Sequence, residues 1–196
     1  MPDGTGWLVV GLGNPGADYA GSRHNAGFLV AEELVRRSQR AKWKKQMEGC
    51  LARTEIGGSP VWLLRPMTYM NLSGRCVGRV ARHLDVPLER LLVVHDEVDL
   101  EFGQLKIKLG GGHAGHKGVQ SVIGVLGSRD FARVRVGVGR PAGGGDTADW
   151  VLEGFDRGER AQLAELLGKA ADAVEAVVAL GVTGAMNRYN TRRRDA

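Results

Sequence analysis

His24 and Asp96 stand where the chain could place a general base and the group that orients it. His24 directly precedes a predicted helix over residues 26–40 with Asn25 as its N-cap, and the positive end of a helix disfavours an imidazolium. A neutral imidazole can accept a proton from water near pH 7. Asp96 follows an apolar strand predicted over residues 91–94, so its carboxylate could receive the imidazole N–H and fix the tautomer. The pair favours base-catalysed hydrolysis. The alternatives are a structural histidine and an aspartate that begins a turn or pairs with an arginine.

Two asparagines accompany this pair. Asn14 ends the first predicted strand, residues 7–12, and open α/β sheets bind ligands at the carboxyl ends of their strands. Asn71 lies just before a predicted helix over residues 72–84, where N-capping is the alternative to substrate contact. An amide side chain can donate to a carbonyl and accept from a peptide N–H. The asparagines therefore suit a substrate with a peptide backbone.

A glycine-rich segment, residues 110–118, precedes a predicted helix over residues 118–126. Backbone N–H groups in such a loop, together with the helix dipole, can bind an anion. Lys108 and Lys117 flank the loop, although a flexible surface loop is the alternative. No G-K-[ST] follows the glycines, so the segment is not a P-loop. The sequence therefore predicts a hydrolytic site for a substrate that carries phosphates.

Two other chemistries fit the sequence less well. Residues 11–16 spell G-x-G-x-x-G, but a dinucleotide site needs a helix to open at once on these glycines and an acid at the next strand end. Here about ten residues intervene, and Glu32 and Glu33 lie inside the later helix. No serine has an elbow motif and neither cysteine has a base in its motif, which favours direct attack by water over a covalent intermediate.

The elements that position these residues alternate between strand and helix, which predicts an α/β fold. A mixed twisted β-sheet with helices on both faces is expected, because two of the strands alternate polar and apolar residues as antiparallel or edge strands do. The clearest helix is predicted over residues 158–180, with a stripe of apolar residues on one side. The further predicted strands cover residues 50–56, 60–65, 104–109 and 132–138.

The length of 196 residues predicts one compact domain, residues 1–190, followed by a basic C-terminal tail, residues 191–196. The net charge is +5, and basic residues cluster at residues 36–45, 129–140 and 192–194, which favours a polyanionic partner. Two cysteines are too few for a disulfide framework or a four-ligand zinc site. We expect no metal ligands and no cofactor. With no signal peptide and no apolar run near twenty residues, we expect a cytoplasmic protein without membrane contact.

Seven segments together resemble one family, the bacterial peptidyl-tRNA hydrolases, from Leu8 to Asn190. The resemblance implies one compact α/β domain, similar to phosphorylase and hydrolase folds. It also implies a monomeric, metal-independent esterase without a cofactor, which frees peptide and tRNA from stalled peptidyl-tRNA in translation and ribosome rescue. The segments are VVGLGNPGADYAGSRHNAGF (9–28), RPMTYMNLSG (65–74), VVHDEVDL (93–100), KLGGGHAGHKG (108–118), FARVRVGVGRP (131–141), VLEGF (151–155) and AMNRYN (185–190).

The resemblance also implies the parts that single residues play. His24 would activate water, Asp96 would hold His24 in its proton-accepting form, and Asn14 would sense that the amino group of the substrate is blocked. Further residues would contact the substrate: Tyr19, Tyr69 and Asn71 would line the site for the peptide and the tRNA end, and Lys108 and Arg133 would hold tRNA phosphates.

The chain departs from the family at one position. The family loop usually reads G-H-N-G, whereas this chain reads Gly115-His116-Lys117-Gly118. Lysine keeps a donor, loses the acceptor and adds charge and length. We expect Lys117 to reach toward a tRNA phosphate in an active enzyme. The alternative is a catalytically weak or inactive RNA-binding paralogue on the same fold.

Overall fold

A single seven-stranded sheet organises the described part of this computed structural model, residues 6–190. The strand order is β2-β3-β4-β1-β5-β7-β6. The four central strands run parallel, whereas β2, β3 and β6 pair antiparallel to their neighbours, so the predicted mixed sheet is confirmed. The strands are β1 (Trp7–Gly11), β2 (Lys44–Gln46), β3 (Gly49–Ile56), β4 (Ser59–Pro66), β5 (Leu91–Glu97), β6 (Leu105–Leu109) and β7 (Ala132–Gly137).

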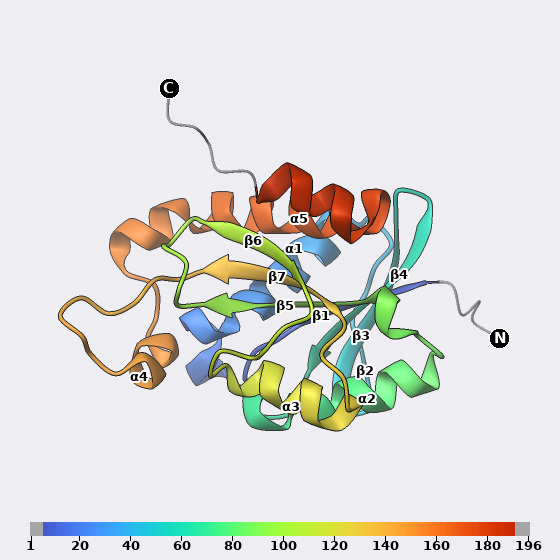
Figure 1. Cartoon of the computed structure of the whole chain (residues 1–196), viewed down its shortest axis with the longest axis horizontal. Coiled ribbons are helices and arrows are strands. Elements are labelled where there is room, and N and C mark those ends of the chain that lie inside the picture. The colour runs from blue at the N-terminus through green and yellow to red at the C-terminus, as the bar shows by residue number, and fades with distance from the viewer. Residues whose placement is uncertain (1–5, 191–196) are drawn as a thin grey trace.

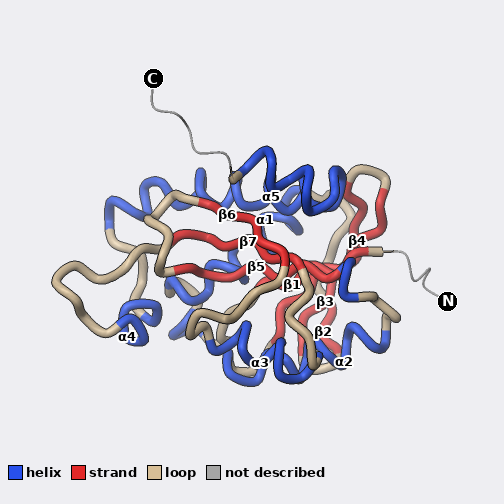
Figure 2. Tube along the Cα trace, viewed as in Figure 1, coloured by secondary structure: helices blue, strands red, loops and turns tan. Residues whose placement is uncertain are grey.

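Helices cover both faces of the sheet, as the sequence predicts (Figures 1 and 2). One pair of helices lies above the sheet in this view and the other pair lies below it, so that two separate apolar cores form. A short helix, α4 (Thr147–Leu152), lies beyond the ends of the central strands. The upper pair is α1 (Ala26–Arg37) and α5 (Arg157–Tyr189), and the lower pair is α2 (Ser73–His83) and α3 (Lys117–Leu126).

The central strand β1 shows why the sequence of a parallel strand is a continuous run of apolar residues. All five of its residues are buried, because helices pack on both of its faces. Trp7 and Val9 belong to the core under α1 and α5. Leu8 and Val10 face the other way, into the core under α2 and α3.

Gly11 at the end of β1 and Gly13 after it serve close packing rather than a dinucleotide turn, because a Cβ on either would overlap α1. Two short 3-10 turns, Ala17–Tyr19 and Arg23–Asn25, intervene before α1 begins. A Cβ on Gly27 would lie 2.3 Å from the Val94 carbonyl oxygen and 2.5 Å from the Leu12 nitrogen. The start of α1 therefore sits directly against the carboxyl ends of β1 and β5, and this contact carries His24 to the end of β5.

Several predicted boundaries change in the structure. Strand β5 runs on to Glu97, so Asp96 lies within the strand and not after it. The predicted helix end at residue 180 is confirmed, because Gly181 (φ 74°, ψ 168°) is not helical, and a second helical segment follows it to Tyr189 within α5. The sequence did not predict β2 or α4. The three residues of β2 are all exposed, and the six residues of α4 are too few to show a helical repeat of apolar residues.

No helix within residues 6–190 is long and apolar enough to cross a membrane. The predicted basic tail, residues 191–196, lies outside the described residues.

Candidate active site

A pocket of about 460 Å³ opens at the carboxyl ends of β1 and β5. Its wall also includes Ala148 and Leu152 of α4 and the start of α3. It brings together seven of the nine site residues that the sequence predicted, although they are spread over about a hundred positions. These seven residues are Asn14, Tyr19, His24, Tyr69, Asn71, Asp96 and Lys117.

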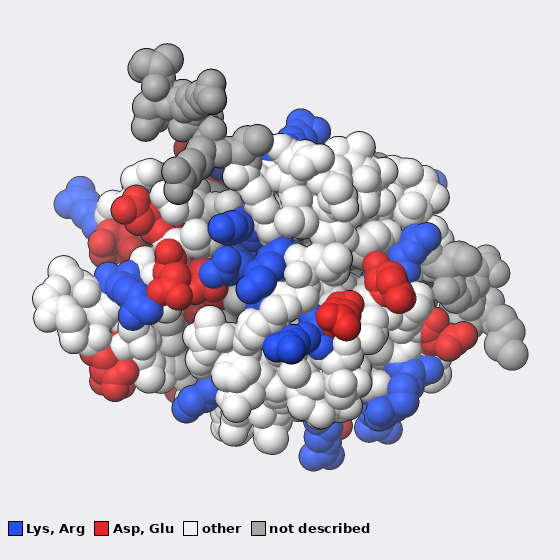
Figure 3. Space-filling view, viewed as in Figure 1, with Lys and Arg blue, Asp and Glu red and all other residues white. Residues whose placement is uncertain are grey.

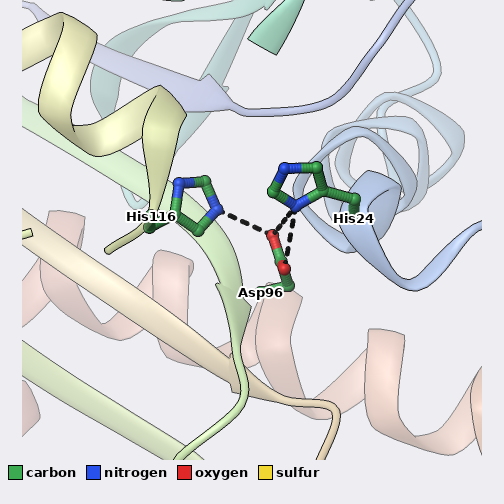
Figure 4. A group of neighbouring side chains, drawn as sticks. All are labelled: His24, Asp96 and His116. Atoms are coloured by element: carbon green, nitrogen blue, oxygen red, sulfur yellow. Dashed lines mark hydrogen bonds and ion pairs between the residues drawn. The ribbon is translucent and has the colours of Figure 1, made fainter. Parts of the chain in front are cut away.

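The predicted contact between His24 and Asp96 is present (Figure 4). His24 Nδ1 lies 2.9 Å from Asp96 Oδ2 and 3.0 Å from Oδ1. The Asp96 side chain is 3% exposed and that of His24 is 11% exposed. Because a carboxylate accepts the hydrogen bond, Nδ1 carries the proton of the neutral ring. The lone pair is therefore on Nε2, which makes His24 able to accept a proton.

A second histidine, His116, binds the same carboxylate, and the sequence analysis did not assign it to the site. Its Nε2 lies 2.8 Å from Asp96 Oδ1, on the opposite side from His24 (Figure 4). Its Nδ1 accepts a hydrogen bond of 3.2 Å from the Val119 N–H, as the N-cap of α3. Since Nδ1 accepts, Nε2 carries the proton and the ring is neutral. The signal available in the sequence was its position just before the predicted helix.

These contacts set the charge of Asp96. Burial alone raises the pKa of a carboxyl group, but the charge interactions with His116 and His24, together with their hydrogen bonds, hold the pKa of Asp96 far below its usual range. His95 lies next in the strand and is fully buried, which lowers the pKa of its imidazole. Its Nδ1 donates to the Asp96 backbone oxygen at 2.7 Å. The centre of the site therefore holds one ionised carboxylate between the rings of His24 and His116.

The neighbours of His24 fix its position from both sides. The Arg23 guanidinium donates to Glu159 at 2.7 Å and stacks 3.5 Å from the centre of the Trp150 ring, which ties the turn to α4 and α5. Asn25 occupies the N-cap position of α1, but its side chain does not cap the helix. Instead it accepts from the Asn14 N–H at 2.8 Å and donates to the Asn14 carbonyl at 3.0 Å. The capping prediction for Asn25 is wrong, because this strand-end pairing takes its side chain.

Asn14 presents its amide in one orientation. Its Oδ1 accepts a hydrogen bond of 2.7 Å from the Met70 N–H, so this end of the side chain must be the oxygen. The Nδ2 group is then the end that can donate to a substrate. Asn71 lies in the 3-10 turn Met70–Leu72 and is exposed, while Leu72 takes the N-cap position of α2. The capping alternative for Asn71 is therefore wrong.

Exposed apolar side chains surround this part of the pocket. Tyr69 is 61% exposed although it is aromatic, and Met67 and Leu72 are also exposed. A large aromatic face open to solvent beside a polar pocket can stack on a base or pack against a peptide side chain.

The two predicted phosphate-binding residues lie next to the pocket, at the start of the glycine-rich loop. Arg133 is only 2% exposed, and its Nη2 donates to the carbonyl oxygens of Gly110 at 2.6 Å and Gly111 at 3.1 Å. Arg133 therefore supports the loop, because its Nη2 is hydrogen-bonded to these two loop carbonyls. Burial and the repulsion of nearby guanidinium groups lower the pKa of both Lys108 and Arg133. A bound anion would relieve this repulsion.

The basic groups predicted from the sequence do not form one surface. Figure 3 shows Lys and Arg side chains gathered over β6 and β7, beside acidic side chains. The group at residues 36–45 includes β2, which forms the opposite edge of the sheet. Arg36 and Arg37 of this group pair with Glu33. The group at residues 192–194 lies outside the described residues.

One set of side chains could hold a metal ion. His24, Asp96 and His116 each offer one ligand atom, and these atoms lie within 4.8 Å of one another. No metal ligands were expected from the sequence, because residues so far apart in the chain show no ligand spacing.

Comparisons with known proteins agree with this geometry. The sequence model of the family described as Peptidyl-tRNA hydrolase matches residues 8–196. A protein named Peptidyl-tRNA hydrolase from Frankia casuarinae is 47% identical over 190 residues, which cover 96% of each chain. A protein of the same name from Sorangium cellulosum is 49% identical and covers 94% of this chain and 84% of its own.

Solved structures give the same result. The crystal structure of peptidyl-tRNA hydrolase from Acinetobacter baumannii superposes with a TM-score of 0.88 at 35% identity, over 96% of each chain. A purine nucleoside phosphorylase from Toxoplasma gondii shares the fold alone, with a TM-score of 0.53, 8% identity and coverage of 89% of this chain and 91% of its own. The expected likeness to phosphorylase folds is confirmed. The matches over nearly the whole length show that this chain belongs to the peptidyl-tRNA hydrolase family.

Proposed function

We propose that His24 is the general base with which this peptidyl-tRNA hydrolase activates water. The observation that carries the proposal is the hydrogen bond from Nδ1 to Asp96, at 2.9 Å, which leaves the lone pair on Nε2 in a ring that lines the pocket. A positioned base of this kind contributes typically 10²–10⁴ to the rate.

The reaction then follows from the position of these groups. Water gives a proton to His24 Nε2 while its oxygen attacks the carbonyl carbon of the ester between peptide and tRNA. The imidazolium that forms is stabilised by the carboxylate of Asp96, which is ionised because its pKa is lowered. Collapse of the tetrahedral intermediate breaks the ester bond, and the imidazolium returns the proton to the departing ribose oxygen. Free peptide and free tRNA are the products.

Asn14 is proposed to recognise the blocked amino group of the substrate. Its Oδ1 already accepts from the Met70 N–H, so its Nδ2 donates to a carbonyl of the peptide. A free amino group is charged and offers no carbonyl at this position, so an aminoacyl-tRNA binds less well. Tyr19, Tyr69 and Asn71 line the same pocket and are proposed to contact the peptide and the tRNA end.

The glycine-rich loop is proposed to hold tRNA phosphate. Lys117 is exposed and lines the pocket, and Lys108 lies against Gly111, where a Cβ would stand 2.5 Å from its Nζ. Arg133 holds the loop carbonyls and is proposed to act on phosphate mainly by supporting this shape. Phosphate contacts bind without reading sequence and weaken as salt increases.

We further infer that the enzyme acts as a monomer in the cytoplasm. The family resemblance implies a monomer, and the substrate arises during translation. The domain is proposed to span residues 1–190 and the tail residues 191–196.

The decisive test is release of the amino acid from N-acetyl-aminoacyl-tRNA by purified protein. We expect His24→Ala to lower kcat by about 10²–10⁴ and Asp96→Asn to lower it less, because Asp96 orients the base. His83→Ala serves as the matched control, since His83 is an exposed histidine near the end of α2, and it should keep wild-type turnover. The tRNA affinity of all three variants should stay close to wild type.

Wild-type turnover in His24→Ala would show that the base is another group. A greater loss in Asp96→Asn than in His24→Ala, at equal stability, would reverse the assignment of the two residues.

A further inference from the structure

Three side chains at the wall of the pocket hold their donor atoms in an arrangement that suits a metal ion. The two imidazole rings of His24 and His116 lie on either side of the Asp96 carboxylate (Figure 4), and one ligand atom from each lies within 4.8 Å of the others. Two imidazoles and a carboxylate form a common ligand set for divalent transition metals. We propose that this group binds Zn²⁺ or a similar ion, and that the bound ion blocks hydrolysis.

The distances fit such an ion after small movements. Zinc binds imidazole nitrogen and carboxylate oxygen at about 2.0–2.2 Å, so two ligands of a tetrahedral site stand roughly 3.4 Å apart. The nitrogens of His24 and His116 lie 2.9 Å and 2.8 Å from oxygens of Asp96. Side-chain rotation that opens these two contacts slightly and brings the rings together places all three ligands around one ion. The open side of the pocket leaves the fourth position to water.

Binding requires the protons of both rings to move. Each ring now donates an N–H to Asp96, and a metal needs a lone pair on that same nitrogen. The remaining proton of His24 then lies on Nε2. The remaining proton of His116 lies on Nδ1, which gives up the hydrogen bond from the Val119 N–H. This bond is 3.2 Å long, and its loss, which leaves the buried Val119 N–H without this acceptor, opposes zinc binding.

The same movement removes the general base. With its proton on Nε2, His24 has no lone pair left to accept a proton from water. The metal-bound ring and the proton-accepting ring are therefore mutually exclusive forms. This inhibitory consequence rests on the proposed function of His24, whereas ion binding rests on the geometry of the three side chains alone.

Calorimetric titration of the full-length protein with zinc sulfate tests the binding site. We expect one ion per chain in the wild type, without net release of protons, because each neutral ring only moves its proton to its other nitrogen. His116→Asn and Asp96→Asn should weaken zinc binding by at least the roughly 10- to 100-fold that loss of an outer-shell partner costs. Asparagine keeps a cap at the start of α3, so His116→Asn should fold. His83→Ala should bind zinc as the wild type does.

Turnover measured in the same zinc titration tests the inhibition. Zinc should slow hydrolysis of N-acetyl-aminoacyl-tRNA by the wild type, and excess EDTA should restore it. No zinc binding, or equal zinc affinity in His116→Asn and wild type, would overturn the site. Zinc that binds without slowing turnover, or that speeds it, would overturn the inhibition. If His24→Ala retained wild-type turnover while the wild type still bound zinc through His116, the proposed base would fail and the metal site would stand.

Discussion

Asp96 accepts hydrogen bonds from two rings that reach it from different elements, His24 from the turn before α1 and His116 from the start of α3. His24 and Asp96 could be predicted because each follows or precedes a strong apolar pattern. No comparable pattern pairs His116 with Asp96, because the contact depends on where the glycine-rich loop folds back and on a helix cap. Arg133 was predicted to contact phosphate. Its Nη2 donates to the carbonyl oxygens of Gly110 and Gly111, and this contact could not be predicted because the glycine-rich loop shows no regular sequence pattern.

Lys117 is the residue at which chemistry specific to this chain can be measured. It is exposed, begins α3 and lines the pocket. We expect Lys117→Asn to flatten the dependence of log tRNA affinity on log salt by about 0.7–0.9, the value for one phosphate contact. Titrations of tRNA binding at several salt concentrations measure this slope.

Lys169→Asn is the control for this substitution. Lys169 pairs with Glu165 on the surface of α5, away from the pocket, so its loss should leave the slope unchanged. Equal slopes in Lys117→Asn and wild type would show that Lys117 points into solvent.

The pairing of strands β6 and β7 brings basic residues together at one edge of the sheet. The register of β6 and β7 sets Lys106 opposite Arg135 and Lys108 opposite Arg133. Four basic residues therefore share one face of this edge of the sheet, next to the glycine-rich loop. The alternation of both strands was visible in the sequence, but their pairing was not, because the strands are separated by the loop and by α3.

The contact between α1 and the strand ends can be tested by filling it. A methyl group on Gly27 would overlap the Val94 carbonyl oxygen and the Leu12 backbone. We expect Gly27→Ala to lower the free energy of unfolding by about 1–3 kcal/mol or more, as overpacking does, and to lower turnover because His24 lies on the preceding turn. Urea unfolding, with m unchanged, measures the loss of stability.

Gly124→Ala is the matched control in helix α3. Nothing lies within 4 Å of a Cβ at that position, so alanine should raise stability by about 0.5–1 kcal/mol through helix propensity. A Gly27→Ala protein as stable as the wild type would mean that α1 does not press on the strands as described.

At the scale of the whole molecule, the two cores on either side of the sheet were predictable in kind. Apolar strands between apolar helix stripes imply burial on both faces, and the structure confirms it. The break of α5 at Gly181 agrees with the predicted helix end at residue 180, but the second helical segment after Gly181 was not predicted. That segment brings Asn190 to the edge strand β6, where its side chain bonds both the N–H and the carbonyl of Ile107.

Cys76, in the core between the sheet and the helices α2 and α3, should make the stability of the protein fall at alkaline pH. Burial and the charge of Glu48 raise the pKa of Cys76 to about 12, whereas an unfolded thiol ionises near 8.5. The unfolded chain therefore loses this proton first as pH rises. Stability should fall between about pH 8.5 and 12, by up to about 1.4 kcal/mol per pH unit.

Urea unfolding of the wild type and Cys76→Ser at several pH values checks this dependence. Serine keeps a donor toward the Met47 carbonyl oxygen, which the thiol contacts at 3.4 Å, and does not ionise. The stability of Cys76→Ser should decline less steeply with pH. Parallel curves for the two proteins would contradict the raised pKa.

The anchoring of Arg23 by Glu159 has a consequence for the newborn protein. While it is being made, the chain is itself joined to tRNA by the kind of ester that the finished enzyme cleaves. His24 leaves the ribosome early, but Asp96, His116 and then Glu159 follow it along the chain. At 5–20 residues per second, the last of them is added on the order of ten seconds after His24. Throughout that interval the unfinished chain has a base without a formed site, so it cannot release itself from its own tRNA.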